Sequence, residues 1–127
     1  MVDDKITILI VDDEELFLDS ISQRLVMRGF NVIAVNRGDK ALEAARKHPI
    51  DIAIVDLKMP GMDGEATLEA LKKEHERMEI VILTGHGSSE AALRLIRSGA
   101  YSYLQKPCEI EQLLEIIKDV CGKRTKV

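Results

Sequence analysis

The residues Ile6-Thr7-Ile8-Leu9-Ile10-Val11 form an apolar run of strand length, and Asp12-Asp13 follow it directly. Further runs rich in isoleucine and valine lie at residues 32–35, 52–55 and 80–83, with a weaker one at 102–104. The segments between and after these runs have helical spacing, at about residues 15–28, 39–47, 65–75, 89–98 and 109–121. This alternation of short apolar runs with helical segments predicts five βα units.

The apolar character of the strands indicates how these units assemble. Strands without polar alternation are typically buried on both faces, and βα repeats of this kind form a parallel sheet between helices. Five strands are too few for a closed barrel of eight. We therefore predict an α/β fold, a flavodoxin-like doubly wound (βα)5 domain with a five-stranded parallel sheet of order 2-1-3-4-5. Right-handed crossovers then bring the carboxyl ends of all the strands to one edge.

Composition narrows the class of protein and its partners. Only 3% of the 127 residues are aromatic, so we do not expect a large base-stacking surface. The net charge of −4 gives no general attraction to nucleic acid or to anionic lipid. The apolar runs are too short to span a bilayer, and the acidic N-terminus is unlike a secretory signal. We expect a cytoplasmic domain that binds neither membranes nor nucleic acid directly.

Glycines stand at the expected ends of helices and in an expected turn. Gly29, Gly99 and Gly122 stand where helices should stop. We accordingly predict one domain over residues 1–121, followed at 122–127 by a basic C-terminal tail or the start of a linker. Gly61 and Gly64, after the third strand, are expected to serve a turn in which they allow positive φ.

Polar residues follow four of the five predicted strands. Asp12 and Asp13 end the first strand, Asp56 the third, Thr84 the fourth and Lys106 the fifth. A single aspartate in such a place is usually a helix cap or a turn residue. Three carboxylates at the ends of two neighbouring strands, however, repel one another unless one is protonated or a cation binds. Mg²⁺ suits this site because it binds through one or two carboxylates, waters and a phosphoryl oxygen.

The hydroxyl and the ammonium at the same edge extend the interpretation. Thr84 and Lys106 would hold two oxygens of a phosphoryl group opposite the metal, which points to phosphoryl transfer. The sequence has no suitably placed cysteine and no G-x-x-x-x-G-K-[ST] loop to hold a nucleotide. One carboxylate is therefore the expected nucleophile, and the product is an acyl phosphate.

At these residues the sequence resembles the receiver (CheY-like) domain of two-component response regulators. The resemblance extends from Ile6 to about Cys121. Four motifs carry it: Val11-Asp12-Asp13-Glu14, Asp56-Leu57-Lys58-Met59-Pro60-Gly61-Met62-Asp63-Gly64, Leu83-Thr84-Gly85-His86-Gly87 and Tyr103-Leu104-Gln105-Lys106-Pro107.

The resemblance implies a phosphoacceptor and a metal site. Asp56 matches the phosphoacceptor of the family. Asp13 matches a direct Mg²⁺ ligand, and Asp12 one that acts mainly through water. The backbone carbonyl of Lys58 would be a further ligand. The resemblance thus implies Mg²⁺ as the cofactor.

It also implies the parts of a switch. Lys106 would pair with one phosphoryl oxygen, and Thr84 would bond another and act as the switch hydroxyl. Tyr103 matches the aromatic residue that turns inward when Thr84 is recruited. The Lys106–Pro107 peptide is expected to be cis, as is usual in the family and tolerated by proline. His86 falls where family side chains vary; a solvated loop residue is favoured over a second acid/base group.

Two other function classes share parts of this pattern. A phosphatase or mutase of haloacid-dehalogenase type also uses an aspartate nucleophile with Mg²⁺, but such enzymes resemble a DxD pattern after the first strand. Here that run is Asp12-Asp13-Glu14-Glu15, and the best nucleophile follows the third strand. A flavin or nucleotide carrier is disfavoured because three carboxylates stand where a phosphate-cradling loop should be.

We therefore expect a signalling module rather than an enzyme with an external substrate. It would take a phosphoryl group from a sensor histidine kinase or a histidine phosphotransfer protein, and would catalyse only its own phosphorylation and dephosphorylation. Thr84 precedes the fourth helix, and Tyr103 lies on the fifth strand. The signal should leave through the face that the fourth helix, fifth strand and fifth helix form, where a partner or a second copy would bind.

Overall fold

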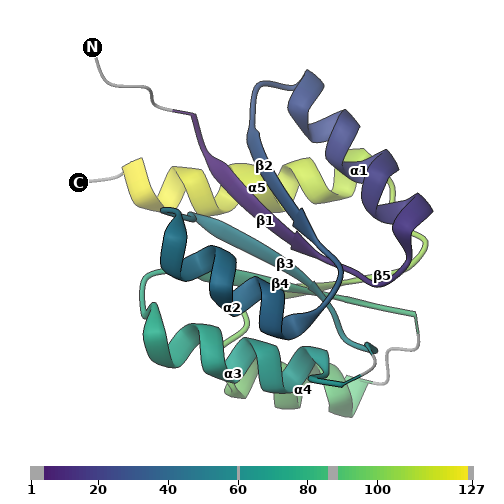
Figure 1. Cartoon of the computed structure of the whole chain (residues 1–127), viewed down its shortest axis with the longest axis vertical. Helices are drawn as coiled ribbons and strands as arrows, with labels where there is room; N and C mark the ends of the chain where they lie inside the picture. The colour runs from purple at the N-terminus through teal and green to yellow at the C-terminus, as the bar shows by residue number, and fades with distance from the viewer. Residues whose placement is uncertain (1–4, 60, 86–88, 126–127) are drawn as a thin grey trace.

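The structure is a computed structural model that describes residues 5–59, 61–85 and 89–125 (Figure 1). Within these residues strands and helices alternate as predicted: β1 (Thr7–Val11), α1 (Glu15–Met27), β2 (Asn31–Val35), α2 (Gly38–Lys47), β3 (Ile52–Asp56), α3 (Gly64–Glu74), β4 (Glu79–Thr84), α4 (Ser89–Arg97), β5 (Ser102–Gln105) and α5 (Ile110–Thr125). Except at the end of α5, every boundary lies within one residue of its expected place.

The strands form one parallel sheet of order β2-β1-β3-β4-β5, which confirms the predicted topology. Its register fixes the relative heights of the strand ends. Val11 is aligned with Val55, so the next residues, Asp12 and Asp56, leave neighbouring strands at the same level. Thr84 is aligned with Gln105 on the other side of β3, so Lys106 starts just beyond it.

Helices cover both faces of the sheet (Figure 1). Buried aliphatic side chains of α1 and α5 pack on one face, and those of α2, α3 and α4 pack on the other. All five residues of β3 are buried, as expected for a strand between two helical layers. The edge strand β2 is only partly buried, because it has a neighbouring strand on one side only.

Two of the three expected helix stops are confirmed. Gly29 and Gly99 follow α1 and α4 with φ of 95° and 117°, a conformation that favours glycine. Gly122 differs, because α5 continues through it to Thr125 and it has no positive φ. A glycine inside a helix costs only about 1 kcal/mol, which the residues around it can offset. The Lys106–Pro107 peptide is cis, as expected.

Among the described residues, no helix combines the length and the apolar character needed to cross a membrane.

Candidate functional site

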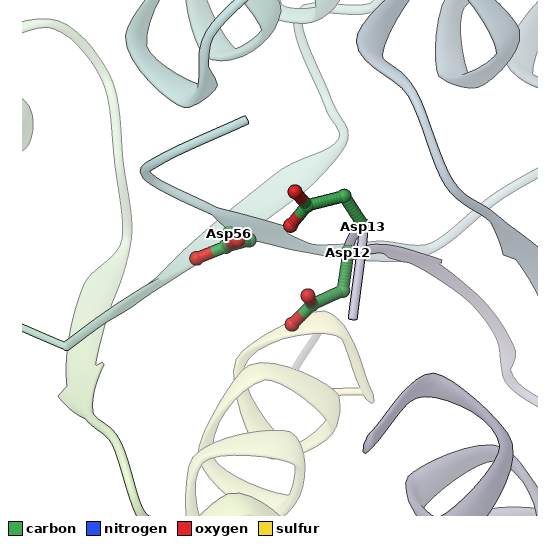
Figure 2. Close-up of side chains that lie close together, drawn as sticks. All are labelled: Asp12, Asp13 and Asp56. Carbon is green, nitrogen blue, oxygen red and sulfur yellow. The ribbon is translucent and has the colours of Figure 1, made fainter. Parts of the chain in front are cut away.

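Three carboxylates meet at the carboxyl edge of the sheet (Figure 2). Asp12 and Asp13 follow β1, and Asp56 is the last residue of β3. Each offers one oxygen atom, and these three atoms lie within 4.8 Å of one another. Asp12 and Asp56 are buried, whereas Asp13 is exposed to solvent. The expected convergence of these carboxylates is therefore confirmed.

Asp12 uses its two carboxylate oxygens for different purposes. Oδ1 accepts a hydrogen bond of 2.9 Å from the backbone N–H of Glu14, just before α1 begins. Oδ2 lies 2.7 Å from Nζ of Lys106. The local role that aspartate commonly has before a helix and a role in the site are thus combined in one side chain.

Lys106 connects the far end of the sheet to the acidic cluster. Its Nζ lies 2.7 Å from carboxylate oxygens of both Asp12 and Glu14, but 3.6 Å from the nearest oxygen of Asp56. Its backbone N–H donates to the carbonyl of Thr84 at 2.8 Å. Burial by itself would lower the pKa of the Lys106 ammonium, but the hydrogen bonds with Asp12 and Glu14 raise it well above its usual value. The site therefore contains a permanent positive charge.

Asp56 is poorly neutralised by these surroundings. Burial, followed by the charge of Asp12, raises the pKa of its carboxyl group from an ordinary 3.8 to about 6. Lys106 and the backbone N–H of Lys58 oppose the shift, yet only in part. A bound cation would relieve this repulsion, and three carboxylate oxygens are ligands that Mg²⁺ prefers. The residues present therefore fit a hard divalent cation.

The remaining residues of the expected switch lie on the next two strands. Thr84 ends β4 and is buried, with 3% of its surface exposed. Tyr103 lies on β5, and 41% of its surface is exposed. His86, which is expected to be a solvated loop residue, lies outside the described residues.

Comparison with protein families identifies this arrangement. The model of the response regulator receiver domain matches residues 8–118, which include every strand except the first residue of β1. The chain belongs to the receiver domain family. Receiver domains are phosphoacceptor signalling modules rather than catalytic enzymes, and a histidine kinase is the partner that the family implies. The cluster of Asp12, Asp13 and Asp56 is typical of the family's metal site.

Two curated relatives of this receiver domain are longer proteins. A putative NtrX-like response regulator of Rickettsia bellii is 36% identical over 118 residues, which are 91% of this chain and 25% of the relative. The transcriptional regulatory protein ZraR of Escherichia coli is 35% identical over 113 residues, or 89% of this chain and 26% of the relative. The chain thus spans about a quarter of the length of these curated relatives.

Solved structures of receiver domains agree with this fold over nearly the whole chain. A CheY-like receiver domain protein of Methanospirillum hungatei has a TM-score of 0.90 at 31% identity, covering 97% of this chain and 99% of that one. The receiver domain of NtrX from Brucella abortus has a TM-score of 0.84 at 31% identity, covering 89% and 96%.

The turn after β3 corrects one expectation about glycine in this receiver domain. Gly61 has a φ of 76°, as predicted, but Gly64 has no positive φ. Gly64 is instead packed against the backbone that follows the acidic cluster. A Cβ atom there would collide with the carbonyl oxygen of Asp56 and would lie 2.5 Å from Cα of Leu57. The residue is small because two backbone segments meet, which sequence spacing does not reveal.

Sequence reasoning also missed two neighbours of Lys106. Glu14 binds its ammonium, and the ring of Phe17 lies beneath it, with 4.6 Å between Nζ and the ring centroid. A signal for both was present in the sequence. Glu14 directly precedes α1, and Phe17 lies three positions later in the first turn of that helix, a spacing at which the two side chains can approach one neighbour.

The raised pKa of Asp56 gives a prediction about stability. Without divalent cations, the ionised carboxylate destabilises the folded chain above pH 6, and this penalty fades as the pH falls from about 6 toward 4. We expect Asp56→Asn to raise the free energy of unfolding by about 1–3 kcal/mol near pH 8, and progressively less at acidic pH. Chemical denaturation in EDTA across this pH range measures the difference.

Asp19→Asn is the matched control. Asp19 is exposed on α1, and its substitution removes the same negative charge as Asp56→Asn. An Asp56→Asn variant that gained no more stability near pH 8 than this control would contradict the electrostatic account of the site.

The packing of Gly64 gives a second prediction. Gly64→Ala must push the start of α3 away from the backbone of Asp56 and Leu57, so we expect a loss of about 1–3 kcal/mol in the free energy of unfolding. Gly122→Ala is the control, since its added Cβ would meet nothing within 4 Å beyond its chain neighbours and the backbone of its own helix. Denaturation of both variants tests this; equal stability of the Gly64→Ala chain and the native chain would refute the close approach.

Proposed function

We propose that this receiver domain is a phosphorylation-dependent switch of a two-component phosphorelay, with Asp56 as its phosphoacceptor. The observation that carries the proposal is the meeting of three carboxylates, within 4.8 Å of one another, with the ammonium of Lys106. Asp56 is the acid at the end of the central strand β3, between the Asp12–Asp13 pair and Thr84. No other described cluster of acidic, histidine or cysteine side chains has this arrangement.

The reaction moves a phosphoryl group from nitrogen to oxygen. A carboxylate oxygen of Asp56 attacks the phosphorus of a phosphohistidine on a partner histidine kinase or histidine phosphotransfer protein. The P–N bond breaks as the new P–O bond forms, and the imidazole leaves and takes up a proton. Lys106 and Thr84 each hold one oxygen of the transferred group, a charge-assisted and a neutral hydrogen bond respectively.

Asp12, Asp13, Asp56 and the backbone carbonyl of Lys58 are the residues that we propose to hold Mg²⁺. When bound, Mg²⁺ offsets the negative charge of the carboxylates and of the phosphoryl oxygens. Asp13 is the solvent-exposed member of the set, which leaves a side of the site open to an incoming phosphoryl donor. Asp12 is already engaged by Glu14 and Lys106, which agrees with a ligand that acts mainly through water.

We propose that the signal leaves through α4, β5 and α5. The hydroxyl of Thr84 moves toward the phosphoryl group on Asp56 and vacates space that the exposed ring of Tyr103 fills. Leu93 and Ile96 of α4, with 56% and 39% of their surfaces exposed, provide apolar contact area on the helix that follows Thr84 in the chain. A change in Tyr103 thus alters a surface suited to a partner or a second copy of the chain.

A mass measurement tests the phosphoacceptor and the cation together. Acetyl phosphate with Mg²⁺ should add one phosphoryl group to the native chain, and none to Asp56→Asn. EDTA or Asp13→Ala should abolish the addition, since uncompensated carboxylates repel the phosphoryl dianion. Asp19→Asn serves as the control and should react normally. Modification of Asp56→Asn, or a normal rate in EDTA, would overturn the proposal.

Backbone amide NMR tests the route of the signal. Beryllofluoride, whose fluorides stand in for phosphoryl oxygens, should shift resonances from Thr84 to Lys106 and along α4 and α5. Lys106→Ala should still bind Mg²⁺ but lose these distant shifts, because the ammonium couples the site to β5. Shifts confined to α1 and α2 would rule out the proposed route.

A further inference from the structure

Lys106 is held by residues just before α1 and in its first turn. Its ammonium lies 2.7 Å from Glu14, 2.7 Å from Asp12 and 4.6 Å above the centre of the Phe17 ring. Asp56, at 3.6 Å, is beyond hydrogen-bond distance. The cation that the phosphoryl group on Asp56 would need is therefore bound closely by Asp12 and Glu14 before phosphorylation, and its contact with Asp56 is the longest of its three ion pairs.

The two carboxylates that hold the ammonium are not equivalent. Asp12 is fully buried and also accepts a hydrogen bond from the Glu14 backbone, so its carboxylate is fixed in place. The side chain of Glu14 is 65% exposed. Water can solvate its carboxylate when the lysine leaves, so breaking the contact with Glu14 costs little, whereas breaking the contact with buried Asp12 costs much more.

We propose that Glu14 is a positioning residue for Lys106. Its carboxylate keeps the ammonium beyond hydrogen-bond distance of Asp56 until a phosphoryl group on Asp56 attracts the ammonium. The inference rests on the proposed function, and it adds a competitor to that reaction. A phosphoryl group on Asp56 and the carboxylate of Glu14 attract the same ammonium. Glu14 thus weakens the binding of Lys106 to the phosphoryl group. The contact between Lys106 and the residue before α1 therefore depends on whether Asp56 is phosphorylated.

The contact has the size of one exposed ion pair, which sets the expected effect. Removing the charge of Glu14 should strengthen the binding of a phosphoryl mimic by about two- to fivefold. The backbone N–H of Glu14 still donates to Asp12 in a Glu14→Gln variant, so the start of α1 should be kept.

The test compares Glu14→Gln with Glu15→Gln. Glu15 is the next residue in α1, carries the same charge, and accepts from Nδ2 of Asn36 at 3.3 Å rather than from Lys106. Beryllofluoride is titrated at saturating Mg²⁺ and followed by NMR, which keeps any change in metal affinity out of the comparison. We expect about two- to fivefold tighter binding by Glu14→Gln and an unchanged affinity for Glu15→Gln.

A second readout follows the lysine itself. The side-chain ¹³Cε resonance of Lys106, assigned with a Lys106→Ala variant, should shift in metal-free Glu14→Gln and stay in place in Glu15→Gln. An unshifted resonance would overturn the proposal. The proposal would also be overturned if Glu14→Gln bound beryllofluoride no more tightly than the native chain. Equal tightening by Glu14→Gln and Glu15→Gln would overturn it too, since the effect would then come from the change in net charge alone. A native chain that bound no beryllofluoride would instead refute the proposed function, while the metal-free resonance would still decide the role of Glu14.

Discussion

The repulsion among three carboxylates at one edge of the sheet is the constraint on which the site depends. Asp12 and Asp56 are buried, and the ammonium of Lys106 is 2.7 Å from one but 3.6 Å from the other. The nearer carboxylate is therefore paired, while the pKa of the farther one rises to about 6 through burial and the charge of Asp12. Such a site has more negative than positive charge, and a bound cation reduces the repulsion among its carboxylates.

The sheet brings these carboxylates together and is stable enough to keep them there. Parallel pairing aligns Val11 of β1 with Val55 of β3, so the residues that follow them, Asp12 and Asp56, lie on neighbouring chain segments at the same level. The strands that carry them are almost entirely apolar and buried between two helical layers. Burial of these side chains stabilises the fold enough to hold charges where isolated segments would separate.

Several groups of the site also hold the secondary structure together. Asp12 binds the backbone before α1, the backbone of Lys106 binds Thr84 at the end of β4, and Gly64 lies against the carbonyl of Asp56 at the start of α3. The residues at this edge of the sheet are therefore in direct contact with the ends of three elements.

The sequence determined the elements, the strand order and the meeting of the carboxylates, because these follow from local periodicity and from the topology of parallel sheets. The chemical roles of the site residues stay predictions. Only the tertiary structure placed Lys106 on Glu14, 92 residues away, and Gly64 against Asp56. It also carried α5 past Gly122. Such contacts depend on the directions of side chains and the distance between packed backbones, which no spacing within one segment encodes.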